Sequence, residues 1–403
     1  MAIISVFAPS HCKVSELAGI IANGLGCDLA GDTEVAALAA RRFNVPPEKI
    51  LKTLSGKVSA FNRFTREREI NISRAAVAVS ELVQKDRLVV TGNAALLFPR
   101  AVPHVLSVCI SASHDFRLAQ AKNEGLDEAT AQKEIKRDDE RLLSLAGHLG
   151  LSDPFAASLY DITLSMDRHS PKEAADMIIA NARKDVVLAT SQSMAKAADF
   201  ALSAHVAAAL AAEGHDVAVT AENGAVTVTI NQHVLMLSRL EEEIKTTVTG
   251  LSGVKSVTVK VGPEFHKPDI YRKADFSLPS RVLLVDDERQ FVETLSDRLS
   301  MRDVGSAVVY NGEDAISFVC DDEPEVMLLD LNLPGMNGIE VLRRVKQDHP
   351  RVEVIILTGH GSARDEAVCR ELGAFAYLEK PVNIDVLAET MRLANEKARE
   401  KRG

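Results

Sequence analysis

The sequence has few aromatic residues and no tryptophan. Aromatic side chains make up 4% of its 403 residues, so platforms that stack nucleic-acid bases are not expected. Basic residues are also fewer than acidic ones. The chain has 47 Lys and Arg against 57 Asp and Glu, which gives a formal net charge of −10. This charge disfavours a nucleic-acid-binding surface without excluding a local basic patch. Because no helix-turn-helix or basic reading helix is evident either, we expect no DNA-binding domain.

Cysteine pairs and long apolar runs are also missing. The five cysteines show no CxxC pair and no histidine spacing typical of zinc, which favours buried thiols in a reducing cytosol: Cys12, Cys27, Cys109, Cys320 and Cys369. No apolar run reaches the roughly 18 residues of a membrane span. The apolar start, Met1 to Ala8, lacks the basic residues and long core of a signal peptide and predicts a β-strand. We therefore expect a cytoplasmic protein without a membrane span.

Four short apolar runs near the C-terminus each lead into polar residues. Val282–Val285 precedes Asp286 and Asp287, Val326–Leu329 precedes Asp330, Val354–Leu357 precedes Thr358, and Ala374–Leu378 leads through Glu379 to Lys380 and Pro381. Helix-period segments follow the runs, so the pattern predicts βα units around a parallel sheet. Since ligands bind at the carboxyl ends of such strands, these polar residues should share one pocket.

That pocket has the residue types of a phosphoryl acceptor site. Three close carboxylates repel one another and favour a hard divalent cation such as Mg²⁺. Asp330 follows the middle strand and is the best candidate nucleophile, because a carboxylate can form an acyl phosphate. Thr358 and Lys380 could each bind a phosphoryl oxygen, and a tight turn favours a cis bond before Pro381. Any one of these residues alone would suggest only a solvated strand end; all five in order disfavour that interpretation.

Residues 281–400 closely resemble the response-regulator receiver domain of two-component signalling. The resemblance is carried by Val285–Glu288, Leu329–Gly338, Thr358-Gly359 and Lys380-Pro381. It implies a flavodoxin-like (βα)5 fold over 281–403. It also implies phosphorylation by a sensor histidine kinase or a histidine phosphotransfer protein.

The resemblance further assigns roles to individual residues. Asp330 would be the phosphoacceptor, and Thr358 and Lys380 would contact the phosphate. Mg²⁺ would be held by Asp286, Asp287, Asp330 and the backbone carbonyl of Asn332. Tyr377 matches the aromatic residue that rotates with Thr358 when the domain is phosphorylated.

Two segments precede the receiver-like region. Residues 263–280 contain Pro263, Pro268 and Pro279 without apolar periodicity, which predicts a linker. Residues 196–262 predict an α-β-β-α-β unit, with an Asn223-Gly224 turn between its first two strands. That order, with the turn over 251–257, resembles the BON domain, a small ligand- or lipid-associated module. A spacer or dimerisation role is favoured, and a homodimer through this unit or the receiver is left open.

Residues 1–190 predict a further parallel α/β domain, with strands near 3–7, 87–92, 104–110 and 160–165. The succession resembles the cytidylate-kinase-like family of P-loop nucleoside monophosphate kinases. The resemblance is carried by Val90–Ala94, Asp138–Arg141 and Tyr160–Arg168. It implies ATP and CMP as ligands, with Arg137 and Arg141 on the lid that closes over their phosphates.

The phosphate loop departs from this family. A phosphate cradle needs glycines so that successive N–H groups can turn toward the anion, whereas residues 8–15 contain none and Pro9 lacks an N–H. Lys13 could still reach a phosphate, although a solvated helix-start lysine is the simpler interpretation. Arg137 and Arg141 could equally pair with the acidic residues around them. We therefore expect a catalytically degenerate, pseudokinase-like domain.

Together these patterns predict a response regulator that accepts phosphate on Asp330. It would signal through its N-terminal domains by protein–protein contact. Two alternatives stay open: a receiver-regulated cytidylate or nucleotide kinase, and a nucleotide-sensing scaffold.

Overall fold

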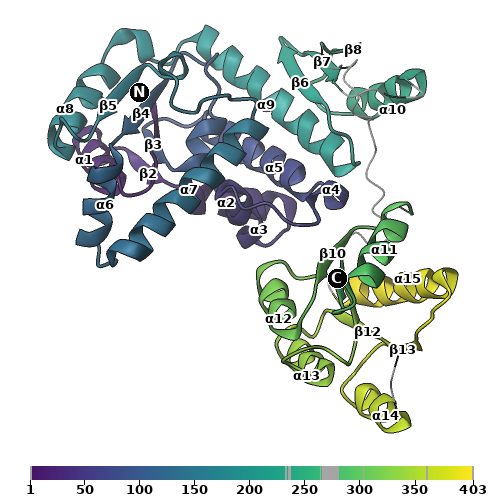
Figure 1. Ribbon diagram of the computed structural model, residues 1–403. Coiled ribbons are helices and arrows are strands. Elements are labelled where there is room, and N and C mark those ends of the chain that lie inside the picture. Colours follow the sequence, from purple (N-terminus) through teal and green to yellow (C-terminus); the bar gives the residue numbers. More distant parts are fainter. Residues whose placement is uncertain are drawn as a thin grey trace. The chain divides into compact units, whose positions relative to one another are not determined.

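A computed structural model describes residues 2–231, 234, 237–263, 265, 281–302, 304–359 and 362–401. Apart from Pro263 and Phe265, the linker predicted over 263–280 lies outside the described residues. The chain divides into two compact units (Figure 1). The first comprises Met1–Val58 and Arg68–Arg272, and the second comprises Ser59–Glu67 and Lys273–Gly403.

The first unit is built on a five-stranded parallel sheet of order β2-β3-β1-β4-β5. Its strands are β1 (Ile3–Phe7), β2 (Asp28–Ala30), β3 (Leu88–Thr91), β4 (Val105–Ser111) and β5 (Ile162–Ser165). The central strand β1 is buried along its whole length. Successive β1 side chains enter opposite apolar cores, Ile3 one and Ile4 the other, because strand side chains alternate between the two faces.

Helices cover this sheet. They are α1 (Val14–Leu25), α2 (Asp32–Phe43), α3 (Pro47–Leu54), α5 (Glu67–Leu82), α6 (His114–Asn123), α7 (Glu128–His148) and α8 (Pro171–Ala182). The resemblance-bearing stretch Asp138–Arg141 lies in the middle of α7. Among the cysteines, Cys12, Cys109 and Cys369 are buried as expected, whereas Cys320 is exposed.

A small sheet follows the long helix α9 (Ser191–Ala212). Strand β6 (Ala218–Glu222) pairs antiparallel with β7 (Ala225–Ile230), and β7 pairs parallel with β8 (Ser256–Val261) after helix α10 (Leu237–Thr249). The predicted α-β-β-α-β order is present, and both Asn223 and Gly224 have positive φ in the β6–β7 turn. Helix α9 serves two cores: Ala197 packs in the larger sheet's core, and Val206 and Leu210 pack in the small one.

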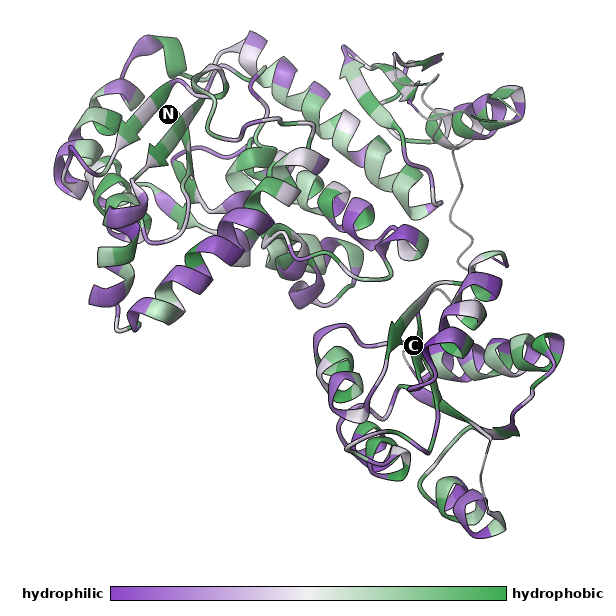
Figure 2. Ribbon diagram, in the orientation of Figure 1, coloured by the Kyte–Doolittle hydropathy of each residue, from purple (hydrophilic) through white to green (hydrophobic). Residues whose placement is uncertain are grey.

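The second unit contains a parallel sheet of order β10-β9-β11-β12-β13. Its strands are β9 (Val282–Val285), β10 (Ser306–Val309), β11 (Val326–Leu329), β12 (Glu353–Thr358) and β13 (Ala376–Glu379). Helices α11 (Arg289–Ser300), α12 (Gly312–Asp321), α13 (Gly338–Asp348), α14 (Ala363–Glu371) and α15 (Ile384–Glu400) flank it, and the short α4 (Asn62–Thr65) belongs to the same compact unit. The order is flavodoxin-like, which confirms the predicted α/β class. Figure 2 shows the strands as hydrophobic, in keeping with an apolar core on each face.

No helix among the described residues is both long and apolar enough to cross a membrane.

The small sheet's stability should depend on Ile244, which α10 buries completely. We expect Ile244→Ala to lower the free energy of opening this sheet by about 2–4 kcal/mol, because it leaves a cavity. Hydrogen exchange of the β7 and β8 amides measures the effect. Thr246→Ala, an exposed position on the same helix, is the control. Equal exchange in the two variants would contradict the core assigned here.

Candidate functional site

The carboxyl ends of β9, β11, β12 and β13 bring the predicted acceptor residues together. Leu329 of β11 pairs with Val285 on one side and Ile356 on the other, so Asp330 emerges between the two neighbouring strand ends. Asp286 follows β9, Thr358 ends β12 and Lys380 follows β13. The parallel register therefore gathers side chains that are up to 94 positions apart, from Asp286 to Lys380, at one sheet edge.

Lys380 is the electrostatic centre of this edge. Its Nζ lies 2.6 Å from Asp286 Oδ2, 3.4 Å from Asp330 Oδ2 and 3.3 Å from Glu288 Oε1. Asp286 and Asp330 are only 4% and 5% exposed. Burial alone would lower the pKa of Lys380, but these carboxylates outweigh it and raise that pKa. The ammonium therefore stays charged and offsets repulsion between two buried acids. The Lys380–Pro381 bond is cis, as predicted.

The same edge has the oxygen ligands for a divalent cation. Carboxylate oxygens of Asp286, Asp287 and Asp330 lie within 4.8 Å of one another, and Asp287 is exposed at the mouth. Burial raises the pKa of Asp286, partly offset by Lys380 and by the Glu288 N–H, while the charge of Asp330 raises it further. Excess negative charge in a half-buried, all-oxygen site fits Mg²⁺. Asn332 is exposed two residues after Asp330, and its carbonyl as a fourth ligand stays a prediction.

The loop after β11 fixes the orientation of Asp330. Its Oδ1 accepts a hydrogen bond from Leu331 N at 2.7 Å, and Gly338 N donates to Leu331 O at 3.1 Å. A Cβ on Gly338 would lie 2.2 Å from Asp330 O, so only glycine lets the loop close this tightly. Asp330 Oδ2 remains directed toward Lys380.

Thr358 and Tyr377 lie where a switch would need them. Thr358 is completely buried at the end of β12, one strand from Asp330. The Tyr377 ring packs against the apolar cluster that contains Leu329 and Leu331. Its hydroxyl is buried with no hydrogen-bond partner among the described residues. An unsatisfied buried hydroxyl is costly, so this ring position can be displaced at low cost.

The first unit has a separate cleft of about 610 Å³ beside the glycine-free loop. Of the three predicted nucleotide-binding residues, Lys13 and Arg141 line it, whereas Arg137 does not and lies 3.6 Å from both Glu134 and Asp138. The loop turns without glycine because His11 and Lys13 adopt left-handed backbone conformations, with φ of 59° and 54°. These uncommon backbone conformations let the loop turn where a glycine would ordinarily be expected.

The cleft is more acidic than the sequence suggested. Carboxylates of Glu16, Asp32, Glu124, Asp138 and Asp139 line it. Asp32 accepts from the backbone N–H groups of Asn93 and Ala94, and burial raises its pKa despite these bonds. Sequence reasoning missed Asp32, because it follows a strand of only three residues.

Arg117 was missed as well. It is 6% exposed and binds Asp139 through both terminal nitrogens, at 2.9 and 2.8 Å. It also donates to Ser10 O and Ser10 Oγ. Its hydrogen-bonding capacity is thus spent within the protein rather than on a ligand. No local motif marks it, since Ser10 lies 107 positions away.

The second unit has a doubly wound sheet with this cluster of polar side chains at its carboxyl edge, and it resembles known proteins. Residues 282–392 match the response regulator receiver domain, and residues 3–168 match the cytidylate kinase-like family, so both expected families are found. Residues 196–262 lie outside both matches, and the BON resemblance stays a prediction.

Two curated relatives each match about a quarter of the chain. The transcriptional regulatory proteins CpxR of Klebsiella pneumoniae subsp. pneumoniae (strain HS11286) and of Escherichia coli (strain K12) are each 38% identical over 113 residues. Each match covers 28% of this chain and 48% of that protein, so the chain spans about half the length of the curated relatives it matches. A solved response regulator receiver domain protein (CheY-like) from Methanospirillum hungatei JF-1 is 27% identical, covering 31% of this chain and 99% of its own, with a TM-score of 0.29.

Gly338→Ala should destabilise the acceptor loop by about 1–3 kcal/mol, because its Cβ would clash with the Asp330 carbonyl. Thermal unfolding of the full chain, followed separately for its two units, measures this loss. Gly147→Ala in α7 is the matched control: a Cβ there meets nothing within 4 Å, so we expect a gain of up to about 1 kcal/mol. A neutral Gly338→Ala variant would show that the loop has room for a side chain.

Lys380→Met should cost about 3 kcal/mol at pH 7, because it leaves two buried carboxylates without their cation. The folded-state pKa of Asp286, already raised, should rise further above its unfolded value. The folded state then holds more protons than the unfolded state, so the variant's stability should fall as pH rises above about 4.

Denaturant unfolding between pH 4 and 8, with and without Mg²⁺, measures this dependence. Lys397→Met is the control, because its partner Glu353 also lies 3.2 Å from Lys346. A pH profile for Lys380→Met parallel to the control's would contradict the assigned role.

Proposed function

We propose that this protein is a two-component response regulator that accepts a phosphoryl group on Asp330 with the help of Mg²⁺. The observation that carries the proposal is the position of Lys380 between the buried carboxylates of Asp286 and Asp330, beside the exposed Asp287. A folded protein keeps buried acids this close only at an energetic cost. A bound cation and phosphoryl group would explain why the protein tolerates that cost.

The transfer is a displacement at phosphorus. Asp330 Oδ2 faces Lys380, while Oδ1 is held by Leu331 N–H, so Oδ2 is the attacking oxygen. An O–P bond forms as the P–N bond to the donor histidine breaks, and the departing imidazole takes up a proton. The bound cation supplies charge neutralisation. Lys380 then pairs with a phosphoryl oxygen, and the Thr358 hydroxyl binds another.

A neighbouring groove supports a protein donor. It has a volume of about 620 Å³ and lies between α11 and the start of α15. Phe291, Leu295, Val382 and Ile384 give it an apolar lining, with Arg289 and Arg298 at the same surface. Phe291 also contacts Lys380, whose Nζ lies 4.6 Å from the ring centre. A sensor histidine kinase or histidine phosphotransfer protein docked here would present its phosphohistidine to Asp330.

We propose that the output passes to the N-terminal domains through protein contact. The proposed layout is a degenerate cytidylate-kinase-like domain over 1–190, a BON-like spacer over 196–262, and the receiver over 281–403. Degeneracy is supported by the commitment of Arg117 to Asp139 and Ser10 and by the acidic lining of the cleft. Phosphorylation would pull Thr358 toward the phosphate and reorient Tyr377.

A receiver-regulated nucleotide kinase or nucleotide sensor is the second candidate, because Lys13 and Arg141 do line one cleft. Calorimetric titration of the full chain with Mg-ATP and with CMP tests it. Binding that weakens in a Lys13→Ala variant would favour this candidate. Absence of binding at millimolar nucleotide would remove it.

Acetyl phosphate and Mg²⁺ should label wild-type protein at Asp330, giving one acid-stable, base-labile phosphoryl group per chain. Intact-mass spectrometry measures the stoichiometry. Asp330→Asn should abolish labelling, whereas Asp287→Asn should retain it with a roughly tenfold higher Mg²⁺ requirement, because one of three anionic ligands is lost. Asp385→Asn, an exposed receiver aspartate outside the site, is the control. Equal labelling of Asp330→Asn and wild type would refute the proposal.

A further inference from the structure

Nine residues of the kinase-like sequence pack with the receiver. Ser59–Glu67 lies between α3 and α5 in the chain and within the stretch that matches the cytidylate kinase-like family. Its contacts nevertheless place it in the same compact unit as the receiver. We call Ser59–Glu67 the docking segment. It remains covalently joined to Val58 and Arg68 of the first unit.

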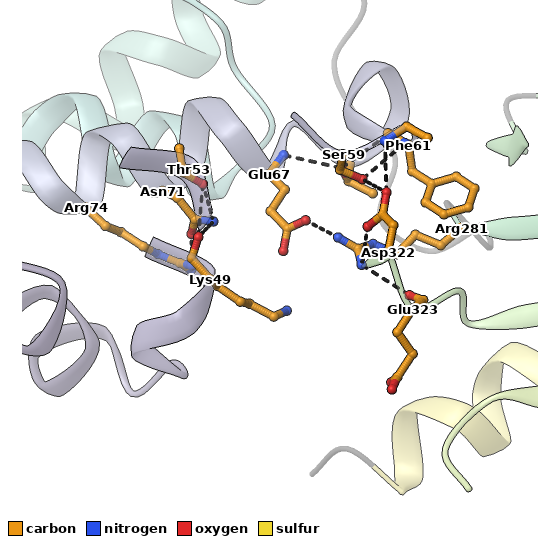
Figure 3. A network of polar contacts seen from close by, with 12 residues as sticks. Lys49, Thr53, Ser59, Phe61, Glu67, Asn71, Arg74, Arg281, Asp322 and Glu323 are labelled. Atoms are coloured by element: carbon orange, nitrogen blue, oxygen red, sulfur yellow. Dashed lines mark hydrogen bonds and ion pairs between the residues drawn. The ribbon is translucent and has the colours of Figure 1, made fainter. Parts of the chain in front are cut away.

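Polar contacts bind the docking segment to two receiver residues (Figure 3). Asp322 Oδ2 accepts hydrogen bonds from Ser59 Oγ at 2.8 Å and from Ala60 N at 2.9 Å. Arg281 forms an ion pair with Glu67 and also lies 3.8 Å from Asp322 Oδ1. These groups are largely buried, with side chains of Asp322 and Arg281 only 9% and 12% exposed. Charged hydrogen bonds at such burial are stronger than surface pairs.

An apolar anchor accompanies them. Phe61 is fully buried, and its ring packs edge-on against Phe318 of α12 with centroids 5.7 Å apart. A large buried aromatic side chain typically dominates the energy of a small contact surface. The docking segment thus has a specific seat formed by Arg281, Phe318 and Asp322.

This seat is connected with the acceptor pocket by packing and by backbone pairing. Phe318 packs against the apolar cluster that contains Leu329, Leu331 and Tyr377, the residues around Asp330 and its switch. Arg281 O accepts from Glu325 N and Val326 N at the start of β11, the strand that ends at Asp330. A rearrangement of the pocket therefore has a short packed route to the seat.

Along the chain, the docking segment follows residues that line or contact the cleft of the first unit. Ser55, four residues before Ser59, lines that cleft. A Cβ on Gly56 would lie 2.2 Å from Arg141 O, so the backbone touches α7 directly beside a cleft residue. Asn93 of the cleft donates to Leu54 O at 2.9 Å. These contacts join the residues just before Ser59 to the cleft.

We propose that Ser59–Glu67 is a built-in output element of the receiver, released when Asp330 is phosphorylated, and that its release alters the cleft around Arg141. The inference rests on the proposed phosphoacceptor function. Direction follows from the state described: the segment is seated while Asp330 is unmodified and paired with Lys380. Release on phosphorylation requires that the modified state hold the segment less tightly than the unmodified state does.

Hydrogen exchange in the full-length chain tests this, with acetyl phosphate and Mg²⁺ as phosphodonor and intact mass recording phosphorylation in the same sample. We expect exchange in 55–67 to become about fivefold faster on phosphorylation, with a smaller increase over 138–145. In Phe61→Ala and in Asp322→Ala, exchange in 55–67 should be fast in both states. Asp330 should still be labelled fully in these variants, because neither residue touches the pocket's polar groups.

Asp385→Ala, which removes an exposed receiver aspartate far from the seat, should respond like wild type. Full phosphorylation with unchanged or slower exchange over 55–67 would overturn the inference while leaving the phosphoacceptor function intact. If Asp330 takes up no phosphate, the proposed function fails, and the inference fails with it.

Discussion

Repulsion among three carboxylates is the constraint on which the receiver depends. Asp286 and Asp330 are buried where the sheet edge gives them little solvent, and Lys380 is the cation that makes this tolerable. Other features of the site keep these carboxylates and Lys380 close together. Gly338 lets the acceptor loop close, and the parallel register brings Lys380 from the far edge strand's end toward the centre. Lys380 offsets enough of the repulsion for the receiver to fold. The remaining negative charge can still bind a cation, which would in turn allow a phosphoryl group to approach.

Each of the two parallel sheets has a polar site, the acceptor pocket in the receiver and the cleft in the first unit. The charged side chains of the two sites have different partners. In the receiver, the excess carboxylates face a cation site and one shared ammonium. In the first unit, the buried guanidinium of Arg117, which binds the loop residue Ser10, is already neutralised by Asp139. Family resemblance alone would lead one to expect phosphate binding there. The distribution of partners, rather than the fold, argues for a changed role.

The sequence foretold those elements whose signals are local. Strands β1, β9, β11 and β12 are buried apolar runs, so their pattern identified them, and the polar residues after them located the acceptor site. Strands β2 and β10 were not located, because β2 has three residues, two of them exposed, and β10 is only half-buried. Asp32 and Arg117 became visible only in three dimensions, since their partners lie 61 and 107 positions away.

The docking segment shows why contacts between distant parts of a chain escape such analysis. Ser59, Phe61 and Glu67 have no motif, and Asp322 is 263 positions from Ser59. Both ends of the segment are covalently fixed, because the chain continues into Val58 on one side and Arg68 on the other. The same covalent attachment limits how far a released segment can travel. A change in the position of Ser59 must therefore be absorbed within a few residues, and Gly56, where a Cβ would lie 2.2 Å from Arg141 O, is only three residues away.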